Sequence, residues 1–262
     1  MKTREPFSIV KGSVTTPAGF RACGFHSGIK KTDRFDLGAI VSDRPAAAAA
    51  VFTLNQIQAA PIKVTKESLA KEQTLQAVVV NSGNANACTG IRGEEDARQM
   101  RLELADALGL PEHYVGVAST GVIGELLPLD TVLRGIQQIP KKLSRDGASD
   151  FAQAILTTDL VEKEACVKVE VDGRPVHIGG AAKGSGMIEP NMATMLGFIT
   201  TDAHIDAVDL QMLLRQVTDR TFNMVTVDGD TSTNDMVVVM ANGMAENERL
   251  HPEHPDWDDF AK

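Results

Sequence analysis

The chain has 262 residues, of which 43% are hydrophobic and 23% charged, the composition of an ordinary globular protein. A formal net charge of −9 argues against a nucleic-acid binder, because phosphate binding requires clustered Lys and Arg side chains. Three cysteines are too few for a disulfide framework, and no segment reaches the roughly 18 apolar residues of a membrane span, so we expect a cytoplasmic protein without membrane contact.

The first half of the chain alternates strand and helix patterns. Residues 75–80 predict an apolar strand that runs into the turn formers of residues 81–86. A helix is expected from Glu94 to a stop at Gly109, with one apolar face made of Ala97, Met100, Leu104 and Leu108. A second strand over residues 114–118 is expected to break at Ser119, Thr120 and Gly121. The alanine run at residues 46–50 is compatible with either helix or strand.

The second half continues the same α/β alternation. Residues 151–156 predict a helix that ends at Thr157, Thr158 and Asp159, and the alternating residues 167–171 and 176–178 around Asp172-Gly173 predict a hairpin. A glycine-rich segment then leads to a strand-like run at residues 195–201. Asp206 is expected to cap a helix through Val217, and further strands are expected at residues 222–227 and 236–240.

Several known site motifs do not fit. The acidic run from Asp228 resembles a calcium loop, but Thr233 and Val239 stand where glycine and glutamate are needed. His251 and His254 each precede a proline, so we expect a solvated pair and no metal site. Nucleotide-binding glycine motifs and a GxSxG elbow are missing from the sequence. We expect the three cysteines to be small buried side chains.

Thr194 remains as a candidate nucleophile. Taken alone, a threonine at the start of a strand is more often structural, because β-branched residues favour strands. A threonine hydroxyl becomes nucleophilic when a cut just before it frees an α-amine, whose pKa of about 7.8 makes it a better base near neutral pH than a lysine at about 10.4. Small Ala193 precedes Thr194, and Pro190 and two glycines shape the approach.

These residues match a known family. Residues 183–187 and 191–196, read as Lys-Gly-Ser-Gly-Met and Asn-Met-Ala-Thr-Met-Leu, closely resemble the bifunctional ornithine acetyltransferases of arginine biosynthesis, also called glutamate N-acetyltransferases. The resemblance extends over almost the whole chain, through residues 18–22, 28–30, 45–52, 80–90, 119–124 and 227–235.

The resemblance implies roles for individual residues. Thr194 would be the nucleophile that becomes acetylated after the chain cuts itself between Ala193 and Thr194. Thr120 and Gly121 would form the oxyanion hole, although a turn at residues 119–121 is by itself more often ordinary. Thr157 and Lys183 would bind substrate, although Lys183 taken alone would more often be solvated.

The resemblance also implies the reaction and the architecture. N-acetylornithine would acetylate the nucleophile, ornithine would leave, and glutamate would take the acetyl group to give N-acetylglutamate. No metal or organic cofactor is required, and some members also use acetyl-CoA. The expected fold is a layered α/β sandwich, shared with self-cleaving aminopeptidases. Residues 1–193 would be the α chain and residues 194–262 the start of the β chain, in an α2β2 heterotetramer.

The sequence departs from the family in two ways. Members usually continue beyond this length and include a stretch Asp-Gly-Glu-Gly-Ala-Thr-Lys with a substrate-binding glutamate, so we expect a C-terminally truncated sandwich. Leu160 and Glu162 stand where threonine and proline are common in the family. Two alternatives stay open on the sequence: a self-cleaving hydrolase of the aminopeptidase type, and an inactive fragment that only binds ligand.

Overall fold

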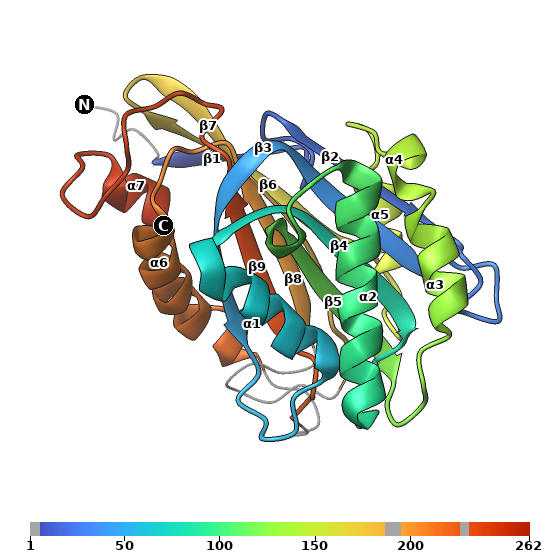
Figure 1. Cartoon of the computed structure of the whole chain (residues 1–262). Coiled ribbons are helices and arrows are strands. Elements are labelled where there is room, and N and C mark those ends of the chain that lie inside the picture. The colour runs from blue at the N-terminus through green and yellow to red at the C-terminus, as the bar shows by residue number, and fades with distance from the viewer. Residues whose placement is uncertain (1–5, 187–194, 226–230) are drawn as a thin grey trace.

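A computed structural model of the chain describes residues 6–186, 195–225 and 231–262. The described strands form one mixed nine-stranded sheet with the order β1-β6-β7-β8-β9-β3-β4-β5, and β2 pairs with β3 (Figure 1). The strands are β1 Phe7–Val10, β2 Phe20–Phe25, β3 Leu37–Phe52, β4 Thr74–Asn84, β5 Val115–Val122, β6 Lys163–Val171, β7 Arg174–Lys183, β8 Leu196–Thr201 and β9 Met236–Ala241.

Helices connect β3 to β4, β4 to β5, β5 to β6 and β8 to β9. They are α1 Ala60–Glu72, α2 Gly90–Leu108, α3 Leu129–Ile136, α4 Ile139–Lys142, α5 Ala148–Ala154, α6 Ala207–Arg220 and α7 Trp257–Ala261, with short 3-10 turns at Glu112–Tyr114 and Phe222–Met224. Among the helices that the structure describes, none is long and apolar enough to cross a membrane.

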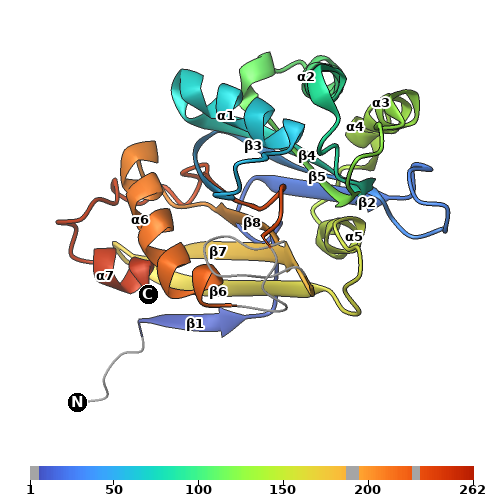
Figure 2. The ribbon, with the colours of Figure 1, turned by 90° about the horizontal axis from the view of Figure 1, so that it is seen from below.

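The long strand β3 joins two halves of the sheet. Its first part pairs with β2 and β4, its last part pairs with β9, and the ladder with β4 shifts register between Val41 and Ala46. The alanine run at residues 46–50, undecided from the sequence, lies in this strand, where both faces are largely buried and small side chains fit. Figure 2 shows β6 and β7 at a different level from β4 and β5, with α5 near the space between them.

Three apolar clusters stack through the molecule and make the fold a layered α/β structure. The side chains of β9 show the arrangement, because Met236, Val238 and Met240 point into an inner cluster with Phe151 of α5, while Val237 and Val239 belong to a cluster under α6 and α7. A third cluster combines side chains of β2–β5 with side chains of α1–α4. Figure 1 shows α2 lying over this half of the sheet.

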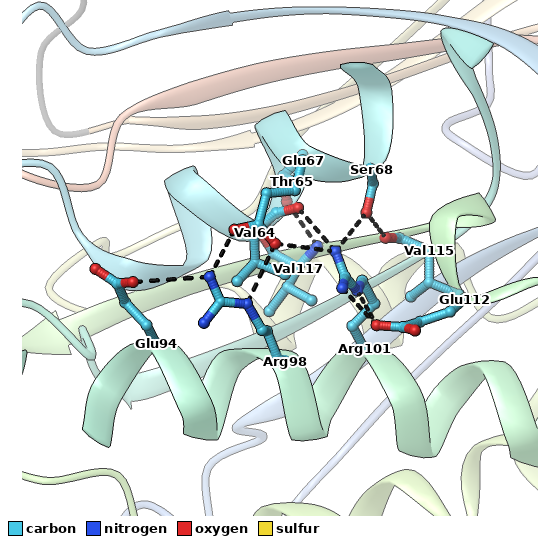
Figure 3. Close-up of polar contacts among 10 residues, drawn as sticks. All are labelled: Val64, Thr65, Glu67, Ser68, Glu94, Arg98, Arg101, Glu112, Val115 and Val117. Atoms are coloured by element: carbon cyan, nitrogen blue, oxygen red, sulfur yellow. Dashed lines mark hydrogen bonds and ion pairs between the residues drawn. The ribbon is translucent and has the colours of Figure 1, made fainter. Parts of the chain in front are cut away.

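Side chains of helix α1 form hydrogen bonds with the backbone along the outer edge of strand β5. The hydroxyl of Thr65 donates to the carbonyl oxygen of Val117 at 2.7 Å and accepts from the Val117 N–H at 2.8 Å, and Ser68 donates to the carbonyl oxygen of Val115 at 2.8 Å. Figure 3 shows Arg98 and Arg101 of α2 reaching Glu67 on the same helix α1. The hydroxyls of Thr65 and Ser68 thus form hydrogen bonds with backbone groups that a strand at the edge of a sheet leaves unpaired.

Most predicted elements are confirmed. Helix α2 carries the expected apolar face and stops at Gly109, whose φ of 67° is the left-handed conformation typical of a helix end. The predicted hairpin is β6 and β7, and both turn residues, Asp172 and Gly173, have positive φ, as a two-residue type I′ turn requires.

Three predictions about elements and one about a cysteine are wrong. Strand β5 does not break at Ser119 but continues to Val122, because it pairs with β4 through the predicted turn. The expected strand at residues 222–227 begins instead as a 3-10 turn, Phe222–Met224. Asp206 precedes α6 but makes no capping hydrogen bond there, and it pairs with Arg249 at 2.7 Å. Of the three cysteines, Cys88 is exposed.

His254 is buried, which corrects the expectation of a solvated pair with His251. Its Nε2 lies 3.1 Å from Asp172 Oδ1, and its Nδ1 accepts the N–H of Asp256 at 3.1 Å. Glu248 lies close enough for its carboxylate, that of Asp172 and the imidazole to face a common point. A ring whose Nδ1 accepts a hydrogen bond carries its proton on Nε2, so this nitrogen is a donor to Asp172 rather than a free metal ligand. The group therefore anchors the hairpin turn to the C-terminal segment.

Candidate active site

The ends of the parallel strands β4 and β5 are shaped by two glycines. Gly83 has φ of 107° and Gly121 has φ of 136°, both in the region that disfavours other residues. A Cβ at Gly121 would lie 2.6 Å from the backbone nitrogen of Asn84, closer than real Cβ atoms approach. The register of the β4–β5 ladder shifts at this point. The two glycines allow the strand ends to meet closely beside Thr120.

Buried amides tie this strand end to the segment before β9. Ser119 donates from its hydroxyl to Asn81 Oδ1 at 2.6 Å, and Asn81 donates to the carbonyl oxygen of Asn84 at 2.9 Å. Asn234 donates from Nδ2 to the carbonyl oxygens of Ala85 at 2.7 Å and Ser119 at 2.8 Å. Since each buried amide has partners, the network holds the ends of β4 and β5 in one arrangement.

A cavity of about 580 Å³ opens at these strand ends. It brings together the four predicted site residues that lie within the described chain, namely Thr120 and Gly121 from β5, Thr157 from the segment after α5, and Lys183 from the end of β7. The other described residues that line it are Lys30, Thr32, Arg34, Gly83, Ala85, Val122, Ile123, Thr158, Gly186, Ser232 and Asn234. Ala193 and Thr194 lie outside the described residues.

The described wall of this cavity is basic. It carries three cationic side chains, Lys30, Arg34 and Lys183, and no acidic side chain among the described lining residues. Lys30 donates from Nζ to the carbonyl oxygens of Phe35 at 2.6 Å and Leu156 at 2.8 Å. Burial, with a smaller contribution from Arg34, lowers the pKa of Lys30 to about 8. Such a wall favours a ligand with carboxylate groups.

Lys183 is buried, with 3% of its surface exposed, so the alternative of a solvated lysine, which applied to this residue taken alone, is wrong. Burial lowers the pKa of its ammonium to about 8, and the negative charges of Asp159 and Asp235 oppose this shift. The pKa of Asp159 is itself lowered: burial acts to raise it, but hydrogen bonds from Lys163 and from the Gly184 N–H outweigh burial. A buried lysine between two carboxylates can meet a substrate carboxylate as a fixed cation.

Asp235 contacts the backbone of Met195, close in sequence to the predicted cut. Its Oδ1 accepts the N–H of Met195 at 3.0 Å, one residue after Thr194. Burial raises the pKa of Asp235 to about 7, against the opposing effects of Ser232, the Met195 N–H and Lys183. Sequence analysis missed Asp235 because its environment comes from strands far apart in the chain. The available signal was the acidic run from Asp228, which we tested only as a calcium loop.

Comparison with solved structures identifies the class of fold. The crystal structure of the arginine biosynthesis bifunctional protein ArgJ from Bacillus halodurans matches with a TM-score of 0.69 and 56% identity, covering 71% of this chain and 98% of that chain. Ornithine acetyltransferase from Mycobacterium tuberculosis, solved in complex with ornithine, matches with a TM-score of 0.65 and 37% identity, covering 70% of this chain and 98% of that chain. The molecule thus has the layered α/β fold of the ornithine acetyltransferases.

The same layers occur in a more distant enzyme. An L-aminopeptidase D-Ala-esterase/amidase from Ochrobactrum anthropi, described as a variant of the Ntn hydrolase fold, matches with a TM-score of 0.53 and 13% identity, over 88% of this chain and 73% of that chain. At that identity the likeness concerns the fold alone.

Sequence relatives then give the family. The ArgJ family model matches residues 21–262, and the chain belongs to the ArgJ family. The arginine biosynthesis bifunctional protein ArgJ of Halalkalibacterium halodurans is 59% identical over 261 residues, and that of Bacillus cereus is 58% identical over 261 residues. These matches cover 100% and 99% of this chain but 63% and 64% of the relatives' own length.

Proposed function

We propose that the protein is a self-cleaving, N-terminal-threonine acetyltransferase that moves an acetyl group from N-acetylornithine to glutamate in arginine biosynthesis. The observation that carries the proposal is the convergence of Thr120, Gly121, Thr157 and Lys183 on one basic cavity, where Lys183 pairs in the sheet with Leu196, two residues after Thr194. Family membership supports the same reaction, since the curated relatives are named bifunctional proteins of arginine biosynthesis.

The proposed cut begins with attack of the Thr194 hydroxyl oxygen on the carbonyl carbon of Ala193. A C–O ester bond forms, the Ala193–Thr194 C–N bond breaks, and the hydroxyl proton ends on the nitrogen, which becomes the α-amine of Thr194. Water then hydrolyses the ester to give the Ala193 carboxylate and to return the hydroxyl. The freed amine serves as the base for later turnovers, because its ordinary pKa of about 7.8 leaves much of it unprotonated near neutral pH.

Acetyl transfer would follow in two steps at the same hydroxyl. In the first step, N-acetylornithine gives its acetyl group to Thr194 Oγ, and ornithine leaves with the hydroxyl proton. In the second step, the α-amine of glutamate attacks the acetyl ester, N-acetylglutamate leaves, and the Thr194 hydroxyl regains a proton. Negative charge develops on the acetyl oxygen in both steps. Donors from Thr120 and Gly121 would stabilise that oxygen, and losing one such donor typically costs about a hundred- to a thousandfold in rate.

The basic cavity fits the proposed substrates. Both donor and acceptor are amino acids with an α-carboxylate, which Lys183 would bind while Thr157 contacts the ligand from the opposite segment. The relative from Mycobacterium tuberculosis was solved with ornithine, which supports an amino-acid site in this fold. The proposed chemistry needs no metal or organic cofactor, and acetyl-CoA would enter only as an alternative acetyl donor. The proposed location is the cytoplasm.

The lengths of the solved relatives support the proposed division at residue 193. The Bacillus halodurans chain is matched over 98% of its own length by 71% of this chain, and 71% of 262 residues is about 186 residues. A separate polypeptide of nearly that length is what a cut before Thr194 would give as the α chain. Residues 194–262 would begin the β chain, and two copies of each would form an α2β2 assembly.

Intact-mass spectrometry of the purified full-length protein tests the cut. We expect two polypeptides, one with a new N-terminus at Thr194, and in Thr194→Ala a single uncut chain with no measurable acetyl transfer, since no hydroxyl is left to attack. Thr200→Ala, with its hydroxyl on the adjoining strand β8, is the matched control and should still cut. A wild-type chain that stays whole, or a Thr194→Ala chain that is cut at the same bond, would contradict the proposal.

The shared fold with the aminopeptidase makes a hydrolase the competing function. Glutamate and water can be compared directly as acceptors of acetyl from N-acetylornithine. We expect N-acetylglutamate as the main product, and release of acetate as the main product would favour the hydrolase. An uncut chain that binds ornithine without turnover would favour the ligand-binding fragment.

A further inference from the structure

Both backbone groups of Met195, the residue that follows Thr194, are held. Its N–H donates to Asp235 Oδ1 at 3.0 Å, and its carbonyl oxygen, which belongs to the next peptide, accepts the N–H of Met236 at 3.2 Å. The backbone of Asp235 is fixed in turn, because its carbonyl oxygen accepts the N–H of Thr53 at 2.9 Å. The parallel strands β8 and β9 therefore start from one anchored point.

The carboxyl group of Asp235 does more than pair with a backbone amide. The residue is 1% exposed, and its Oδ2 is buried without a hydrogen-bond partner among the described residues. Burying a carboxylate charge is unfavourable unless the charge is well paired, and an asparagine would fill the same space without a charge. The charge faces Lys183, the one charged group in the described chain that interacts appreciably with it; Lys183 in turn faces Asp159 and Lys163. The charge at this position is better explained by the reaction than by stability.

We propose that Asp235 is a positioning residue for the self-cleavage, which acts through the Met195 peptide to hold Thr194 where its hydroxyl can reach the Ala193 carbonyl. The inference rests on the proposed function. The nitrogen of Met195 is bonded to the carbonyl carbon of Thr194, so a shift of this peptide moves the nucleophile directly. Displacements of about 1 Å in such geometries can cost roughly a hundredfold in rate.

The charge state of Asp235 gives this role a measurable signature. An ionised carboxylate accepts a stronger hydrogen bond from the Met195 N–H than a protonated one does. Because the pKa of Asp235 is about 7, the cleavage rate should rise with pH through that value. The α-amine of Thr194 does not exist before the cut, so it cannot produce this rise. Lys183 titrates higher, with a pKa of about 8.

The test follows cleavage of the full-length precursor, purified unfolded and then refolded into buffers from pH 5.5 to 8.5, with samples quenched and separated by gel electrophoresis. For the wild type we expect the cleavage rate to fall about tenfold per pH unit below the pKa of Asp235. Asp235→Asn keeps an acceptor of the same shape but no charge, so we expect a flat profile and a rate at pH 8 at least about fivefold lower. In Lys183→Met the step should move to higher pH, because the ammonium charge favours ionisation of Asp235.

Asp202→Asn is the matched control. Asp202 is also buried, and its carboxylate accepts backbone N–H groups of Ala18 at 2.9 Å and His177 at 2.8 Å, but it lies at the opposite end of β8. We expect its pH profile to match the wild type. A flat wild-type profile overturns the inference without any variant, and so does an Asp235→Asn profile that keeps the step. A wild-type precursor that never cuts would instead refute the proposed function.

Discussion

Gly121 is closely surrounded by backbone atoms of strand β4. Its backbone passes so close to Gly83 and Asn84 that a single added carbon has no space, and its φ of 136° is rare for other residues. Gly121 lies next to Thr120 in strand β5, and both residues line the cavity. The close approach of the two strand ends and the predicted oxyanion hole therefore both depend on glycine at position 121.

Gly121→Ala should therefore damage both stability and activity. The new Cβ would meet backbone atoms, which cannot move aside like a side chain, so we expect the free energy of unfolding to fall by about 2 kcal/mol or more. Acetyl transfer should fall by about a hundredfold, because the predicted oxyanion donors shift. Chemical denaturation and steady-state kinetics measure the two effects.

Gly124→Ala is a control that separates the effect of steric crowding from the effect of a positive φ. Gly124 also has positive φ, at 86°, but a Cβ there would find nothing within 4 Å. We expect only the conformational cost of about 1 kcal/mol and little change in transfer. If the two alanine variants behaved alike, close packing at Gly121 would not be the cause of the damage.

At the scale of elements, helix α1 completes the edge of β5 through side chains instead of a further strand. Thr65→Val removes the hydroxyl that serves both the N–H and the carbonyl oxygen of Val117, and leaves two buried backbone groups without this partner (Figure 3). Since the substitution conserves shape, packing is retained. We expect the free energy of unfolding to fall by about 1 to 3 kcal/mol, measured by urea denaturation.

Thr74→Val provides the comparison for the same chemical change. The Thr74 hydroxyl donates to the carbonyl oxygen of Glu72 at 3.1 Å in an exposed setting, where water can replace it. Its loss should change the free energy of unfolding by less than about 0.5 kcal/mol. Equal effects of the two valine substitutions would mean that the edge contact contributes little.

Local signals predicted the elements that depend on local chemistry. Asp172-Gly173 specifies its own turn, and the face of α2 follows from the spacing of four apolar residues, so both were predictable. The end of β5 was not, because only the pairing with β4 shows that Thr120 belongs to a strand. The four described residues carried over from the family resemblance line one cavity, and their roles stay predictions. Asp235 was missed because its burial, its contact with Met195 and its nearness to Lys183 arise only when β7, β8 and β9 assemble.

For the whole molecule, the buried pair of Asp235 and Lys183 makes stability depend on pH. The pKa of Asp235 is about 7 in the folded protein against an ordinary 3.8, so between these values the folded state keeps a proton that the unfolded state has lost. Stability therefore decreases as pH rises through this window. The pKa of Lys183 is lowered from 10.5 to about 8, so its contribution increases again as pH rises from 8 to 10.5.

Asp235→Asn should consequently stabilise the protein at pH 8 relative to its effect at pH 5, on the order of a few kcal/mol. Urea denaturation in the uncut Thr194→Ala background measures this, because one continuous chain avoids concentration effects. At pH 5 Asp235 is protonated in the folded state, so the benefit of the substitution is smaller there. A stability difference that does not change between the two pH values would show that Asp235 is ionised throughout.

The strand order β7-β8-β9-β3 has a consequence for a chain cut before Thr194. Strands β8 and β9 would belong to the second piece, yet β8 is hydrogen-bonded to β7 and β9 to β3, both in the first piece. The two pieces would be interleaved, and separating them would expose two strand ladders and the inner apolar cluster at once. Before the cut, the sheet folds within a single molecule. After the cut, two separated pieces could refold only by meeting each other, so the rate of refolding would depend on their concentration.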